Sequence, residues 1–183
     1  MIHPSSPVLL VGIGARRDDA EACARLLRTM PPGLGASYVI AGGLDAAALA
    51  DQRLPQVVRT LAVRDSVRME RDQVYLVSPN SHLRLRESVL SAHRDTKVSR
   101  PAGQVDALFS ELARVSGDRA AGIVLAVPEL QARRGAEAIT RAGGLMMGVA
   151  RDPEASLPAG FEVYLPLDRL ADELVARVAH THR

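Results

Sequence analysis

The sequence predicts a doubly wound α/β fold, with a mostly parallel sheet covered by helices on both faces in a Rossmann-like three-layer sandwich. Short aliphatic runs of the kind found in strands buried on both faces alternate with helical patterns of about eleven residues. Glycine or proline stands at most junctions between them. An insert with alternating apolar and polar residues adds antiparallel hairpin strands at the edge of this predicted sheet.

The first half of the chain opens with a strand, a glycine turn and a helix. Val8 to Val11 is a continuous aliphatic run, and Asp18 or Asp19 is expected to cap the helix that follows. The predicted elements are, in order, a strand at 8–11, a helix at 20–30, a strand at 37–41, a short helix capped by Asp45 and an extended piece at 57–63.

The insert covers residues 67–93. Its segments VYLVSP, HLRLRES and VLSAH read as antiparallel strands with one face in water, joined by turns at Pro79-Asn80 and Glu87-Ser88. The α/β pattern then returns with a helix at 104–115, a strand at 121–127, a helix at 132–142, strands at 145–150 and 161–165, and a closing helix from Asp168. We expect one domain over residues 1–183.

Composition and charge exclude several classes of protein. A net charge of +2, with arginines scattered among acids, argues against a nucleic-acid footprint. The single cysteine, Cys23, excludes an internal disulfide, suits a reducing cytoplasm and is expected to be a small buried hydrophobe. The apolar run after the first residues is too short for a signal peptide or a membrane span. We therefore expect a cytoplasmic protein.

The order of several motifs resembles a known family. VLLVGIGA, VYLVSPNSHLRL, RPAGQVDALFSELA, GIVLAV and AITRAGGLMMGVARDPEAS occur in the order seen in the catalytic domain of CheB-type chemotaxis receptor methylesterases. The resemblance spans residues 8–156, and the pairing of RPxxxxDxLF with the later AGGxxxxxxxDPEAS is its most specific part. It implies the CheB fold and hydrolysis of glutamate methyl esters by a serine nucleophile, a histidine base and an aspartate. No receiver domain is expected within the chain.

The chain departs from that family pattern at each catalytic position. The resemblance puts Arg16 where the serine belongs, and Asp18 and Asp19 where two glycines belong. It puts Gly42 at the histidine and Gln131 at the aspartate, with Pro128 at a turn whose N–H groups would hold the oxyanion. An alignment shift does not restore the triad, because no serine lies between residues 6 and 37 and no histidine between residues 3 and 82.

Other arrangements of reactive side chains are open to a functional and to a structural interpretation. Ser78, Ser81, His82, His93 and Asp106 could form a displaced triad, but we favour hairpin-turn and surface roles. We favour structural roles for Asp106 and Arg100: Asp106 would be a carboxylate near the start of a helix, and the two would form a structural ion pair. The Gly12-Ile13-Gly14 turn lacks the third glycine of a dinucleotide site. His180 and His182 at the tail are an isolated pair, so we expect no metal and no cofactor.

The sequence thus favours a degenerate CheB-like domain, inactive as an esterase, that binds a protein partner in a chemosensory-type pathway. The partner classes are a chemoreceptor, a methyltransferase or a response regulator; no nucleic acid and no membrane insertion are expected. Two alternatives are an active glutamate methylesterase or other carboxylic-ester hydrolase with rearranged residues, and a domain that binds a small acidic ligand. The candidate cleft residues are Gly14, Arg16, Arg17, Asp18, Pro128, Glu129 and Gln131.

Overall fold

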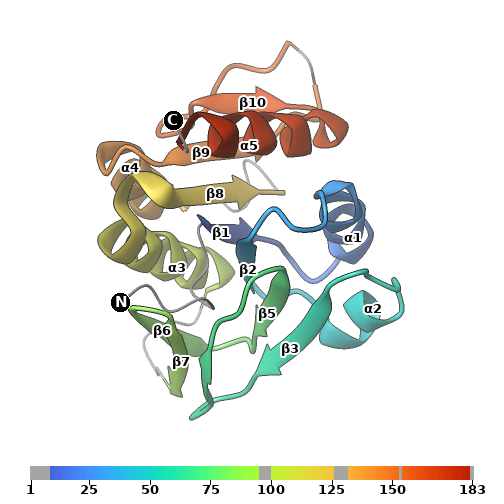
Figure 1. The fold of residues 1–183 in the computed structure, drawn as a ribbon, viewed down its shortest axis with the longest axis vertical. Coiled ribbons are helices and arrows are strands. Elements are labelled where there is room, and N and C mark those ends of the chain that lie inside the picture. The colour runs from blue at the N-terminus through green and yellow to red at the C-terminus, as the bar shows by residue number, and fades with distance from the viewer. Residues whose placement is uncertain (1–8, 95–99, 126–131, 153, 182–183) are drawn as a thin grey trace.

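The computed structural model describes residues 9–94, 100–125, 132–152 and 154–181, and it has the predicted α/β architecture (Figure 1). Sheet A has seven strands in the order β10-β9-β8-β1-β2-β5-β3, and all neighbouring pairs are parallel. Its strands are β1 (Leu9–Gly14), β2 (Ala36–Ala41), β3 (Val57–Leu61), β5 (Gln73–Val77), β8 (Ala120–Val124), β9 (Leu145–Val149) and β10 (Val163–Leu165).

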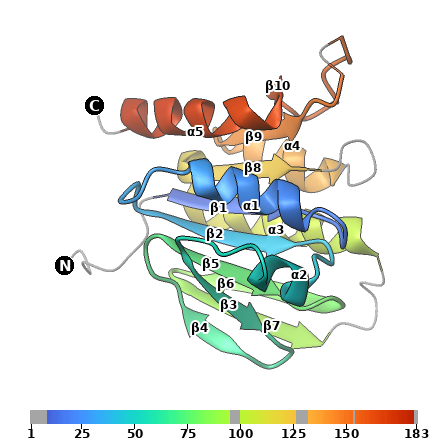
Figure 2. The same cartoon turned by 90° about the vertical axis from the view of Figure 1, so that its right-hand side faces the viewer.

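Helices cover both faces of sheet A (Figure 2). One face packs against α1 (Ala20–Thr29), α2 (Ala46–Ala50) and α5 (Leu167–Thr181). The other packs against α3 (Pro101–Ser116) and α4 (Arg133–Arg141), and a 3₁₀ turn, η1 (Gly117–Arg119), joins α3 to β8. Within the described residues, no helix is both long and apolar enough to cross a lipid bilayer.

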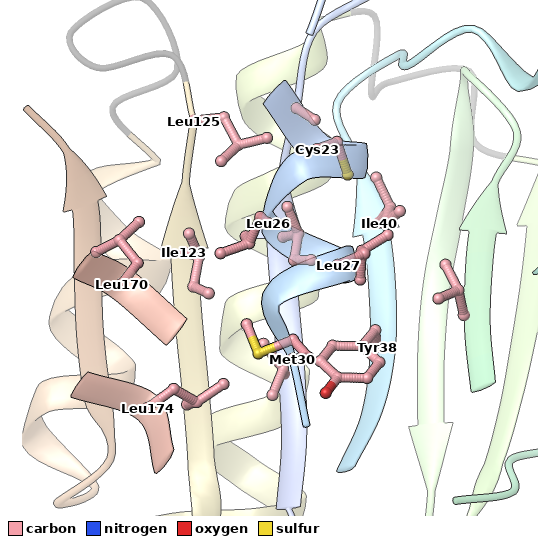
Figure 3. Close-up of a cluster of buried hydrophobic side chains, with 14 of the residues drawn as sticks. Cys23, Leu26, Leu27, Met30, Tyr38, Ile40, Ile123, Leu125, Leu170 and Leu174 are labelled. Atoms are coloured by element: carbon pink, nitrogen blue, oxygen red, sulfur yellow. The ribbon is translucent and has the colours of Figure 1, made fainter. Parts of the chain in front are cut away.

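The core on the α1 side is mostly aliphatic, with the buried aromatic ring of Tyr38 among its members. In Figure 3, α1 lies over β1 and its apolar side chains reach toward strands on both sides. Cys23 is completely buried here, as expected, and burial together with the charge of Asp19 raises the pKa of its thiol to about 12. The side chains labelled in the figure are Cys23, Leu26, Leu27, Met30, Tyr38, Ile40, Ile123, Leu125, Leu170 and Leu174.

The two glycines of β1 serve packing. A Cβ on Gly12 would lie 2.6 Å from Leu112 Cδ1, and one on Gly14 would lie 2.9 Å from Val105 Cγ1. Both contacts are with α3, so the glycines allow this helix to lie close against the central strand. Packing of β1 against α3 therefore accounts for the Gly-x-Gly pattern, and nucleotide binding is not needed to explain it.

A separate antiparallel sheet B has the order β4-β7-β6. Its strands are β4 (Ser66–Arg68), β6 (Ser81–Arg86) and β7 (Val89–Arg94). The predicted alternation is confirmed, because Leu83, Leu85 and Leu90 are buried in the α3-side core. The outer edge of β6 is covered by α3: Leu85 N donates to Glu111 Oε2 at 2.8 Å, and the Arg114 guanidinium donates to Leu85 O.

The structure corrects the placement of the insert. VYLVSP is not an antiparallel edge strand: its residues form β5, a parallel strand between β2 and β3 that is buried over Val74–Val77. The remaining strands form sheet B, which is a second sheet and not an extension of the first. The physical reason lies in β5 itself, where side chains on both faces are apolar and each face has a hydrophobic core to fill.

Candidate functional site

The crevice predicted for an open parallel sheet lies where the strand order reverses, which here is between β1 and β8. From β1 the chain adds β2, β5 and β3 on one side, and β8, β9 and β10 follow on the other. The loops after β1, β2 and β8 frame this edge. Three of the predicted cleft residues, Pro128, Glu129 and Gln131, lie outside the described residues.

The turn after β1 is closed by Asp19. Its side chain is only 9% exposed, and Oδ2 accepts a hydrogen bond from Arg16 N at 2.7 Å. The same oxygen lies 3.5 Å from Arg16 Nε. Asp19 does occupy the N-cap position of α1, but its carboxylate makes no capping bond to the helix. The prediction that an aspartate side chain caps this helix is thus wrong for Asp19, because its carboxylate accepts from Arg16 N in the turn and not from a helix N–H group.

Charged side chains surround this turn. Arg17 and Asp18 are exposed, whereas Arg16 is partly buried against Asp19. Gly14, the last residue of β1, is buried, and its carbonyl oxygen accepts from Leu125 N at 2.9 Å. The described part of the turn therefore holds two guanidinium groups and two carboxylates, and it has no hydroxyl or thiol of the kind that serine and cysteine hydrolases use as a nucleophile.

The turn after β2 requires glycine at position 42. Gly42 has a φ of +113°, and a Cβ there would lie 2.7 Å from Ala15 O and 3.1 Å from Val105 Cγ2. The backbone of the β1 turn thus fills the space into which a side chain would extend. No imidazole fits at this position without moving the chain.

Gln104 joins two of the crevice loops and was missed by the sequence analysis. This α3 side chain is 2% exposed, and its Oε1 accepts from Gly42 N at 3.0 Å. Its Nε2 donates to Ser78 O at 2.9 Å and to Ser81 O at 3.0 Å. A buried amide that satisfies both its acceptor and donor groups fixes the end of β2 relative to the turn between β5 and β6. The sequence did contain a signal for this role, because Gln104 is a polar residue on the apolar side of the predicted helix.

A pocket of about 330 Å³ opens beside these loops at the carboxyl ends of β2, β3 and β5. Arg17, the residue after Arg16, contributes to its wall together with Asp45, Thr60 and Ser78. Leu76 and Leu44 supply apolar surface. Asp45 also caps α2 as predicted, accepting from Ala47 N and Ala48 N. Its volume lies within the range of small-ligand sites, and its described wall carries one guanidinium group and one carboxylate.

The displaced triad considered from the sequence is not assembled. The carboxylate of Asp106 accepts from Gly135 N at 2.7 Å, which caps the first turn of α4. The expected ion pair with Arg100 is therefore wrong, because Asp106 points from α3 to the neighbouring helix. Ser78 lies at the end of β5, and Ser81 is fully buried.

A serine hydroxyl does contact His93, one of the candidates named from the sequence, but the serine is Ser91, which the sequence analysis did not name. Ser91 Oγ lies 3.0 Å from His93 Nε2, two residues along β7 in sheet B. His93 also stands opposite His82 in the register of β6 and β7. The described crevice loops, 15–19 and 42–45, contain neither serine nor histidine. The pair thus lies on sheet B, away from the edge where the fold gathers ligands.

No group of three histidine, cysteine, aspartate or glutamate side chains with metal-binding geometry occurs among the described residues. The side chains of His180 and His182 lie outside the described part of the chain. We therefore derive no metal chemistry for the crevice.

Comparisons with known proteins decide the family. A family model for CheB methylesterases matches residues 11–174, which is most of the chain. The chain belongs to the CheB methylesterase family. The crystal structure of the Thermotoga maritima CheB methylesterase catalytic domain is similar to it with a TM-score of 0.71 at 15% identity, covering 92% of this chain and 97% of that one. This match confirms the predicted fold.

A curated relative supports the same family. The chain is 26% identical to the protein-glutamate methylesterase/protein-glutamine glutaminase 2 of Methanosarcina mazei, and the match covers 89% of this chain. It covers 46% of the relative, so this chain spans less than half the length of that protein.

Proposed function

We propose that this chain is a CheB-fold domain that does not hydrolyse esters and instead binds a protein partner in a chemosensory-type pathway. The observation that carries the proposal is the hydrogen bond from Arg16 N to the Asp19 carboxylate at 2.7 Å. Arg16 stands where the resemblance puts the family's nucleophilic serine. Its guanidinium stays protonated at any ordinary pH and cannot attack a carbonyl.

The same hydrogen bond argues against a usable oxyanion site at this turn. Ester hydrolysis needs N–H donors aimed at the developing oxyanion, and loss of one typically costs about 3–4 kcal/mol of transition-state stabilisation. Here the Arg16 N–H donates to a buried carboxylate. An oxyanion placed at that amide would meet the negative charge of Asp19, so repulsion would replace stabilisation.

The close packing at Gly42 supports the same conclusion. A base must stand within hydrogen-bond reach of the nucleophile. The resemblance assigns that base to Gly42, where Ala15 O leaves no room even for a Cβ. A single substitution to histidine is therefore not expected to restore activity.

The proposed partner classes come from the family. The Methanosarcina mazei relative is named for action on protein glutamate and glutamine side chains. A family member that keeps the fold without the chemistry is expected to bind the proteins that such enzymes meet. We therefore propose a chemoreceptor, a methyltransferase or a response regulator as the partner.

An esterase assay tests the loss of activity. The chain is incubated with a methyl-esterified chemoreceptor fragment and with a generic ester, and the Thermotoga maritima catalytic domain serves as the active control. We expect methanol release at the background rate. Turnover above background that Ser91→Ala or His93→Ala abolishes would overturn the proposal and identify the rearranged hydrolase, because Ser91 is the serine that contacts an imidazole.

The pocket beside Arg17 favours a second candidate function, the binding of a small acidic ligand. A thermal-shift screen of small carboxylates and phosphates would detect it. Arg17→Ala should abolish the shift, whereas Arg119→Ala, another exposed arginine outside the pocket, should not. A screen without a shift, or a shift that both variants keep, would exclude this candidate.

A further inference from the structure

The outer face of sheet B concentrates positive charge on a chain whose net charge is only +2. Exposed arginines come from all three strands and from the turn before β4. We call this surface the basic face. It consists of Arg64, Arg68, Arg84, Arg86 and Arg94, together with His82 and His93.

The strand register arranges these arginines around a floor of small side chains. Arg84 stands opposite Ser91, which stands opposite Ser66 on β4. Arg86 and Arg68 stand on either side of Val89 in the next row. Long cationic side chains therefore flank short neutral ones, and the surface is hollowed between them.

Two depressions result. One has a volume of about 400 Å³, and its walls include Arg64, Arg84 and Arg86. The other has a volume of about 360 Å³, and its described lining consists of His82, Arg84, His93 and Arg94. Arg84 and His93 line both, so the two hollows are neighbours on this face.

Asp65, Glu87 and Glu111 are acids near the basic face, and Glu111 interacts electrostatically with His82. Asp65 lines the first depression, but its carboxylate accepts from Ala62 N at 2.7 Å and so helps to hold the turn before β4. Among the described residues, no ion pair involves Arg64, Arg84 or Arg86. These guanidinium groups are exposed and can each present paired N–H donors to a carboxylate.

Protection of the β6 edge does not explain Arg84 and Arg86. Charged side chains often guard an exposed edge strand against pairing with another chain. The edge of β6 is already covered by Glu111 and Arg114 of α3, which bond to the backbone of Leu85. Arg84 and Arg86 are therefore not needed to guard it.

The chemistry of the basic face fits an acidic polypeptide better than other anionic partners. Arg84 and Arg86 are two residues apart on one strand, so their Cα atoms are separated by about 7 Å. Acidic residues one turn apart on a helix are separated by about 5–6 Å between Cβ atoms. The two spacings are similar, so two successive acids on a helix could each meet one of these arginines. No Phe, Tyr or Trp lies in sheet B, so the face lacks the large aromatic side chains on which single-stranded bases usually stack. The large exposed apolar residues of the described chain, Val57 and Leu157, lie elsewhere and give the face no membrane anchor.

We propose that the basic face of sheet B binds an acidic segment of a partner protein through carboxylate–arginine pairs centred on Arg84 and Arg86. This inference names a surface and a partner chemistry for the binding role proposed above and rests on that role. The basic-face proposal concerns sheet B and is tested by a binding assay. It can therefore fail while the proposed lack of esterase activity still holds.

The test is fluorescence anisotropy of the whole chain with a labelled helical peptide that carries glutamate at every fourth position. A peptide with glutamine at those positions is the neutral control. We expect binding at low salt that weakens as salt rises, and none to the glutamine peptide. Replacing both Arg84→Thr and Arg86→Thr should raise Kd about tenfold. Threonine keeps strand propensity, and a thermal melt checks that each variant folds.

A matched variant removes the same charge elsewhere. Arg59→Thr with Arg119→Thr takes two exposed arginines from outside the basic face and should change Kd less than about twofold. Equal loss in both double variants would overturn the proposal, because net charge alone would then explain binding. Tighter, Arg84-dependent binding of single-stranded DNA or of anionic lipid vesicles would also overturn it.

Discussion

Gln104 offers the sharpest test of how the crevice loops are held. Its buried amide makes three hydrogen bonds, to Gly42 N, Ser78 O and Ser81 O. Each contributes about 1 kcal/mol net, and leaving the buried Gly42 N–H without an acceptor costs about 1–3 kcal/mol more. Gln104→Leu should therefore lower the free energy of unfolding by about 4–6 kcal/mol. For a domain of this size, that corresponds to a fall in Tm of about 8–24 °C.

The measurement is thermal unfolding followed by circular dichroism, with urea unfolding as a second probe. Gln104→Glu is the informative companion variant, because it keeps an acceptor for Gly42 but turns the other oxygen toward two carbonyl oxygens. Burial beside those oxygens would raise the pKa of the new carboxyl above its usual value of about 4.3. Its destabilisation should therefore grow as pH rises above that value, while the leucine variant stays equally destabilised across the range. A leucine variant that melts within 2 °C of the parent would refute the reasoning.

Two further predictions concern the β2 turn and the buried thiol. Gly42→Ala should destabilise the domain by about 2–4 kcal/mol, because the new Cβ would meet Ala15 O at 2.7 Å in a backbone conformation with positive φ. Gly43→Ala also has a positive φ but opens onto empty space, so chemical denaturation should show a loss of only about 1 kcal/mol; equal losses would contradict the packing argument. Cys23 should resist an aromatic disulfide reagent at pH 8 and react rapidly in guanidinium chloride, since burial raises its pKa to about 12. Rapid reaction of the native chain would show that α1 opens readily.

The fold could be predicted from the sequence because its strands carry an unambiguous pattern. β1 and β8 are continuous aliphatic runs, and the helices between strands have clear apolar stripes. The error at β5 had a physical origin. Its residues, QVYLV, are as apolar as a parallel strand requires, but the adjacent polar turn and the alternating strand of β6 suggested a hairpin.

The candidate site could be predicted only in part. The resemblance located the turn at Arg16–Asp19 and the glycine turn at Gly42, and both lie at the edge where the fold gathers ligands. The partners of Asp19, Gln104 and Asp106 could not be predicted, since each contact is set by the packing of separate elements or by the closure of a turn. The absence of a receiver domain and the roles of Pro128, Glu129 and Gln131 stay predictions.

By itself, the sequence determined the α/β class, the family resemblance and the lack of a serine or histidine at the matching positions. Those properties are local, because they depend on residue type and on periodicity along a single stretch of chain. The tertiary structure decided how the remaining groups are used. It brought the Asp19 carboxylate onto the Arg16 amide, placed the Gln104 side chain between two loops and gathered the arginines of three strands on one face. The Gln104 contacts depend on distances between residues far apart in the chain, which the packing of helices against sheets sets, whereas the Arg16–Asp19 bond depends on how the turn after β1 closes.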